Sequence, residues 1–93
     1  MTPGRPLAAL LLCGAGLAAC SRPLPEAGSA DAALYAARCG GCHAPYQPGS
    51  MTAAMWKLQV ERMDQKYRLA GSAPPAGAER DQILRYLGRN AGR

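Results

Sequence analysis

The chain has 93 residues, of which 11 are Lys or Arg and 6 are Asp or Glu, giving a formal net charge of +5. This length holds one small domain at most and excludes a chain of several domains. The basic residues are spread, chiefly as arginines, and are not interleaved with aromatic residues, which argues against nucleic-acid binding.

Residues 1–19 have the pattern of an export signal. Arg5 supplies a positive start, and residues 7–19 are apolar and end in small residues, as secretory signals do. The run is shorter than the roughly 20 residues needed to cross the hydrocarbon layer. We therefore expect the segment to be removed on export. The alternative, a buried N-terminal helix, fits poorly with its Gly-rich end and with the prolines that follow.

The end of this run resembles the processing motif of bacterial lipoproteins, here Leu17-Ala18-Ala19-Cys20. The resemblance implies that Cys20 is the first mature residue and carries a lipid anchor, for which more than one acyl chain is needed. Ser21 after the cysteine favours outer-membrane sorting by the same resemblance. An ordinary secretory signal cut near this place is the alternative, and it would leave Cys20 a free thiol.

Residues 20–30 are predicted to be a lipidated N-terminus and flexible tether, because prolines and small residues dominate there. The folded domain is expected over residues 31–93. Apolar spacing and end signals predict helices at about 31–39, 52–67 and 78–88, with Thr52 as an N-cap. No window alternates as a strand does, so the expected fold class is all-α, with about three helices packed around a cofactor.

The need for a cofactor follows from the thin core. Beyond residue 30 the chain has seven aliphatic residues larger than alanine. Domains of about 60 residues are marginal without a staple or a bound group. We expect a large apolar group to complete the core and the chain without it to be largely unfolded.

The motif Cys39-Gly40-Gly41-Cys42-His43 has the spacing of covalent haem c attachment. Two thiols three positions apart reach the two vinyl groups at one porphyrin edge, and the histidine that follows places an imidazole nitrogen under the iron. A structural zinc site needs four ligands and finds three here. A dithiol redox motif follows a strand, and none is predicted. The export signal agrees with haem attachment, which takes place outside the cytoplasmic membrane.

His43 is the only histidine, so a second histidine ligand from the same chain is excluded, and the single motif predicts one haem c. Methionine is the expected sixth ligand in electron-transfer cytochromes. Met51 follows His43 too closely within a Pro-Gly loop to reach the far haem face. Met63 is favoured over Met55, and Lys66, as a neutral amine, is a further alternative.

Helical spacing is the reason for favouring Met63. Trp56, Val60, Met63 and Tyr67 form one stripe of the predicted second helix, which could lie against a haem face. The simpler alternative is that Met63 only fills the core, since methionine packs well into irregular gaps.

Residues 39–87 resemble the small single-domain cytochromes c. The resemblance rests on Cys39, Cys42, His43, Tyr46, Pro48, Trp56, Met63, Tyr86 and Leu87. It implies a haem held between helices, Met63 as ligand, and terminal helices that cross through Leu34 or Tyr35 and Tyr86 or Leu87. Trp56, Tyr46 and Arg62 are candidates to bind the haem propionates, although Arg62 could equally be solvated.

These features predict a membrane-tethered periplasmic one-electron carrier rather than an enzyme. The expected partners are a membrane, through the lipid anchor, and a redox protein or complex that faces the periplasm. Neither a nucleic acid nor a small-molecule substrate is expected. Basic charge can steer an acidic partner, although spread solvated charge needs no function. The alternatives are a five-coordinate haem protein that binds a gas or peroxide, and a haem-bearing accessory subunit.

Overall fold

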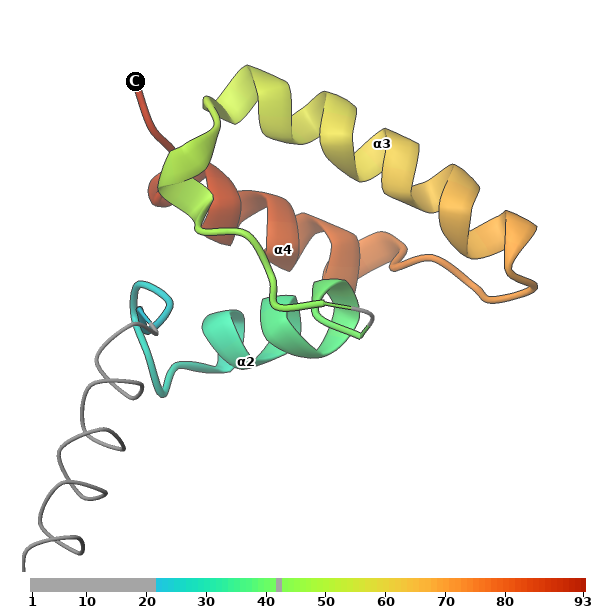
Figure 1. Cartoon of the computed structure of the whole chain (residues 1–93), viewed down its shortest axis with the longest axis horizontal. Helices are drawn as coiled ribbons and strands as arrows, with labels where there is room; N and C mark the ends of the chain where they lie inside the picture. Colours follow the sequence, from blue (N-terminus) through green and yellow to red (C-terminus); the bar gives the residue numbers. More distant parts are fainter. Residues whose placement is uncertain (1–21, 42) are drawn as a thin grey trace, which may run out of the picture.

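The computed structural model describes residues 22–41 and 43–93 (Figure 1). Its elements are α2 (Ala30–Cys39), the 3₁₀ helix η1 (Pro48–Ser50), α3 (Ala53–Leu69) and α4 (Gly77–Arg89). The all-α prediction is confirmed, since the only β-type pairing among the described residues is an isolated bridge between Thr52 and Gly92. No helix in the described ranges is long and apolar enough to span a membrane. The predicted signal peptide, Cys20 and Cys42 lie outside these ranges.

Helix α2 begins and ends at residues that satisfy its terminal backbone groups. The Ser29 hydroxyl accepts a hydrogen bond from the Ala32 N–H at 3.1 Å, as an N-cap does. At the other end the Gly40 N–H donates to the Ala36 carbonyl at 2.9 Å. A Cβ on Gly40 would lie 2.5 Å from that same oxygen. The first spacer of the Cys-x-x-Cys motif therefore has room only for glycine unless the backbone shifts.

The other two helices also lie where the sequence predicts them. Thr52 caps α3, because its Oγ1 accepts from the Met55 N–H at 3.2 Å, and α3 continues to Leu69, two residues past the predicted end. Helix α4 extends the predicted 78–88 by one residue at each end. The turn η1 was not predicted. Pro48 at its first position has a fixed φ suited to a helical turn, which explains how a Pro-Gly loop can form one.

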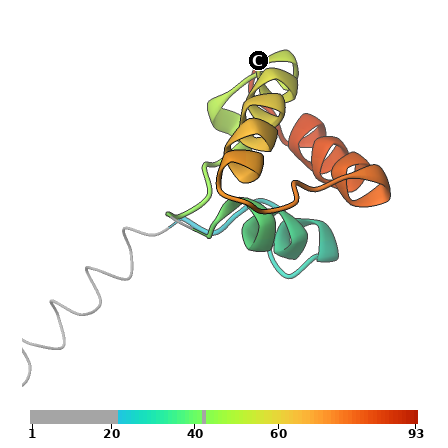
Figure 2. The same cartoon turned by 90° about the vertical axis from the view of Figure 1, so that its right-hand side faces the viewer.

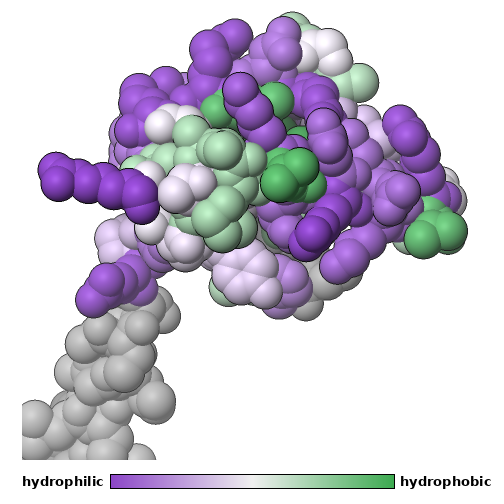
Figure 3. All heavy atoms as spheres, turned by 90° about the horizontal axis from the view of Figure 1, so that it is seen from above, coloured by the Kyte–Doolittle hydropathy of each residue, from purple (hydrophilic) through white to green (hydrophobic). Residues whose placement is uncertain are grey.

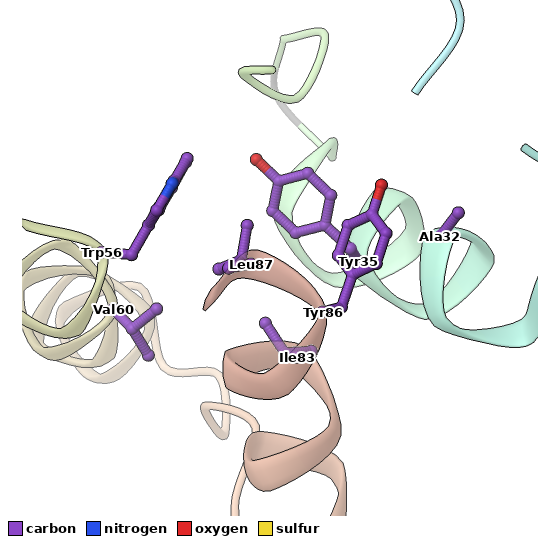
Figure 4. Close-up of a cluster of buried hydrophobic side chains, with 7 residues drawn as sticks. All are labelled: Ala32, Tyr35, Trp56, Val60, Ile83, Tyr86 and Leu87. Atoms are coloured by element: carbon purple, nitrogen blue, oxygen red, sulfur yellow. The ribbon is translucent and has the colours of Figure 1, made fainter. Parts of the chain in front are cut away.

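The core lies between the three helices, which form a triangle in end-on view (Figure 2). Helix α4 packs against both α2 and α3. The Tyr35 and Tyr86 ring centroids are 5.5 Å apart, which confirms the predicted crossing of the terminal helices. Tyr35 also meets Trp56 edge to face at 6.2 Å. The buried core residues point inward from all three helices (Figure 4) and are Ala32, Tyr35, Trp56, Val60, Ile83, Tyr86 and Leu87.

Residues 24–29 differ from the predicted flexible tether, because they form a turn that lies against α4. The Tyr86 hydroxyl donates to the Pro25 carbonyl at 2.9 Å, and the Arg89 guanidinium donates two hydrogen bonds of 2.9 Å to the Glu26 carboxylate. Leu24 packs against the core. The prolines do keep this segment out of helices and strands, as the sequence predicts. The segment is nevertheless fixed in place by its contacts with α4, which lies some 60 residues further along the chain. The folded part thus begins before residue 31.

Candidate cofactor site

A pocket opens between the end of α2, the loop that follows it, α3 and α4. It holds about 750 Å³ of space outside protein atoms, part of it open to solvent. Cofactor sites are mostly apolar, with a few placed polar groups. This pocket has that character. Five residues that the sequence analysis selected line it together: Cys39, His43, Tyr46, Trp56 and Met63.

Cys39 is the last residue of α2 and is half-buried at the pocket wall. Burial raises the pKa of its thiol, although the nearby Arg38 opposes this. Reactive cysteines of dithiol redox motifs have lowered pKa values because their surroundings stabilise the thiolate. The surroundings of Cys39 do the opposite, which argues against the redox-motif alternative. They suit a sulfur that is covalently capped within an apolar wall.

His43 is exposed and lines the edge of the pocket. Its Nδ1 lies 2.8 Å from the Ala44 carbonyl oxygen. A carbonyl can only accept, so the proton of the neutral ring is on Nδ1, and Nε2 has its lone pair available for a metal. Metal-binding histidines commonly donate their other N–H to a carbonyl in this way. The Tyr46 ring lies beside the imidazole, with centroids 5.3 Å apart, at the exposed rim.

The three candidate methionines have different surroundings. Met63 lines the same pocket as His43, together with Lys66 one turn along α3. Met55 is 50% exposed and is absent from the pocket lining. Met51 packs against the hydrophobic core instead. The structure thus brings Met63 and His43 together as the stripe on α3 predicts, while their joint coordination of an iron stays a prediction.

The residues nominated for propionate binding are placed less favourably. The Trp56 indole N–H donates to the Pro48 carbonyl at 2.7 Å, so it is satisfied within the protein and anchors η1 to α3. Arg62 is exposed and does not line the pocket. Tyr46 keeps its side chain at the rim, while its carbonyl accepts a hydrogen bond from Tyr35.

Three polar contacts that no local sequence pattern marks join the three helices near the pocket. Arg80 forms an ion pair with Asp64, and both side chains line the pocket. The Tyr67 hydroxyl donates to the Arg38 carbonyl, and the Arg38 Nε lies 2.7 Å from Glu79. These pairs join residues 16 to 41 positions apart, and no local pattern marks such distant partners.

The donor set fits a haem c: a thiol, an imidazole nitrogen and a thioether meet in one largely apolar pocket. The family model of dihaem cytochrome c matches residues 35–93, more than half of the chain. This match spans the Cys-x-x-Cys-His motif, α3 and α4. No curated protein and no solved structure matches the chain significantly. The chain belongs to the dihaem cytochrome c family and is therefore a c-type cytochrome, a haem-based electron carrier.

Proposed function

We propose that residues 24–93 form an electron-transfer domain with one haem c, attached to Cys39 and Cys42 and bound axially by His43 and Met63. One observation carries the proposal: Cys39, His43 and Met63 line a single pocket although they come from two helices and the loop between them. When bound, the haem would supply a one-electron Fe(III)/Fe(II) couple. A methionine ligand raises the reduction potential of such a couple.

The chain's own residues have distinct parts in this proposal. The thiols of Cys39 and Cys42 would hold the haem covalently, and the Nδ1–H···O=C bond of His43 keeps the imidazole in the tautomer that can bind a metal. The apolar wall, which includes Val60, Ile83 and Leu87, would exclude water from a bound haem, and the haem would complete the thin core. No residue here is assigned a role in transforming a substrate.

The number of haems is the point on which the family name and the sequence differ. The family is described as dihaem. These 93 residues contain one Cys-x-x-Cys-His motif and one histidine, and the match covers the segment with that motif. We therefore propose one haem per copy of this chain, with any second haem on another polypeptide segment.

We further propose that the domain is exported and lipid-anchored at Cys20, facing the periplasm, with the outer membrane favoured. The support is the motif at residues 17–20 and the position of the turn at residues 24–29. Because that turn lies against α4, three residues separate Cys20 from Leu24, and this stretch of chain spans at most ~14 Å. The domain would then lie close to the membrane surface, where a membrane-bound redox partner is within reach.

Covalent haem attachment is tested by changing both thiols. The full chain and its Cys39→Ser/Cys42→Ser variant are expressed with export and haem-maturation machinery and separated on a denaturing gel. Haem staining should follow the unaltered chain and be lost in the variant. Stain that persists in the variant, or that is absent from the unaltered chain, would contradict the proposal.

A further inference from the structure

Two opposite charges face each other on the wall of the pocket. Arg80, in the first turns of α4, donates from Nη1 to the Asp64 Oδ2 on α3. Both side chains line the pocket, and they are only 27% and 16% exposed, respectively. The second carboxylate oxygen, Oδ1, is buried and has no hydrogen-bond partner among the described residues. This ion pair is therefore a partly desolvated feature of the cofactor site.

One member of the pair is the sequence neighbour of a proposed iron ligand. Asp64 directly follows Met63 on α3, and the two residues line the same pocket. The remaining charged residue in the pocket lining is Lys66, which is exposed. The neighbouring Arg38–Glu79 pair is also formally neutral. Asp64 and Arg80 are thus the two least exposed charges of the described pocket wall.

A purely stabilising role explains the pair poorly. Burying two charges costs desolvation that their attraction only partly offsets, so a buried ion pair is weak evidence for stability. The surface pair of Glu26 and Arg89 ties down the N-terminal turn without this penalty, because both side chains are more exposed. The Asp64–Arg80 pair instead places two opposite charges on the wall of the proposed cofactor site, where they would be poorly screened from a bound group.

We propose that Asp64 and Arg80 form a balanced charge pair beside the haem, in which each residue biases the reduction potential in the direction opposite to its partner. The proposal rests on the haem-binding function proposed above. Oxidation of the iron adds one positive charge to the site. A guanidinium without its partner disfavours that charge and raises the potential, while a carboxylate without its partner favours it and lowers the potential. Paired, the two effects largely cancel.

The test is spectroelectrochemical titration of the full haem-loaded chain at constant pH and ionic strength. Asp64→Asn should shift the midpoint potential upward, and Arg80→Gln should shift it downward. The double variant, which lacks both charges, should return near the unaltered value. Glu26→Gln is the matched control, since it converts a carboxylate to an amide in an ion pair outside the pocket. It should leave the potential unchanged.

Opposite signs are the decisive result, because damage to the fold or to Met63 coordination would shift both single variants in the same direction. Equal signs, or shifts no larger than that of Glu26→Gln, would overturn the proposal. If Arg80→Gln does not accumulate as a folded protein, Asp64→Asn and the double variant still decide: the first must raise the potential and the second must restore it. A chain without covalent haem would instead defeat the proposed function itself.

Discussion

The Tyr35 hydroxyl donates a hydrogen bond of 2.6 Å to the backbone carbonyl of Tyr46. This bond joins the middle of α2 to the loop after His43. It therefore links the segment before the Cys-x-x-Cys-His motif to the segment after it. Tyr35 is 1% exposed and also packs against Trp56 and Tyr86. One side chain therefore connects the core to the segment that presents the histidine.

Removing this hydroxyl should destabilise the haem-loaded protein. Tyr35→Phe leaves the ring contacts in place but deprives the Tyr46 carbonyl of its donor, at a cost of about 0.5–1.5 kcal/mol. Burial raises the pKa of the Tyr35 hydroxyl, so the hydroxyl stays protonated and able to donate at neutral pH. Denaturant unfolding of the holoprotein measures the change. Tyr46→Phe is the control, since its exposed ring changes and its backbone carbonyl does not. Equal stability of the two variants would contradict this assignment.

The two spacer glycines of the motif should differ in their tolerance of a side chain. A Cβ on Gly40 would lie 2.5 Å from the Ala36 oxygen and 3.1 Å from Pro45, whereas a Cβ on Gly41 meets nothing within 4 Å among the described atoms. Gly40→Ala is expected to lower the yield and thermal stability of holoprotein, while Gly41→Ala is expected to resemble the unaltered chain. Haem absorbance per chain and the unfolding midpoint report both effects. A more damaging substitution at Gly41 would show that the end of α2 is described incorrectly.

The two methionines of α3 provide a test of the sixth ligand. Met63→Ala should remove the weak methionine–iron charge-transfer band of the oxidised protein and lower the potential, because a methionine ligand raises it. Met55→Ala removes an exposed side chain outside the pocket and should change neither property. Absorption spectra and redox titration of both variants separate the cases. The opposite pattern would transfer the ligand to Met55.

Acidification should release the N-terminal turn before it unfolds the domain. Hydrogen bonds from Arg89 and then Asn90 hold the pKa of the Glu26 carboxyl below its usual value. A group whose pKa is lowered by folding stabilises above its unfolded pKa, and its contribution is lost as the pH falls through the folded value. The protection of the backbone amides in residues 24–29, measured against the intrinsic exchange rate at each pH, should therefore fall as the pH drops below the ordinary glutamate range.

Glu26→Gln should show the same loss of protection already at neutral pH, since an amide cannot replace the two charge-assisted bonds from Arg89. Glu61→Gln, at an exposed position of α3 with no ion pair among the described residues, is the control and should leave the turn unchanged. Rapid exchange in the unaltered chain at all pH values would restore the flexible tether that the sequence predicts.

The helices were predictable because their signals are local. Thr52 as N-cap, apolar spacing along each segment and glycines or prolines between them set the ends of the helices within about two residues. The pocket stripe on α3 was also visible, because helical periodicity alone places Met63 beside Trp56 and Val60. These predictions need no knowledge of distant contacts.

What the sequence did not reveal depends on such distant contacts. Pro25 and Glu26 have the composition of a linker, and only their bonds to Tyr86 and Arg89 make them part of the domain. Arg80 carries no sign that it pairs with a carboxylate 16 residues earlier. Seen from the α3 side, much of the surface is hydrophilic (Figure 3). The many exposed charges of α3 therefore do not single out Asp64, whose side chain is only 16% exposed.

The visible absorption spectrum of the purified full chain, oxidised and then reduced, tests the central claim most directly. We expect one covalent haem per chain, low-spin six-coordinate bands in both states, reversible one-electron cycling, and no change when carbon monoxide is added to the reduced protein. A high-spin spectrum that shifts with carbon monoxide would contradict it and identify an open iron site. That result would favour a protein that binds a gas or peroxide over an electron carrier.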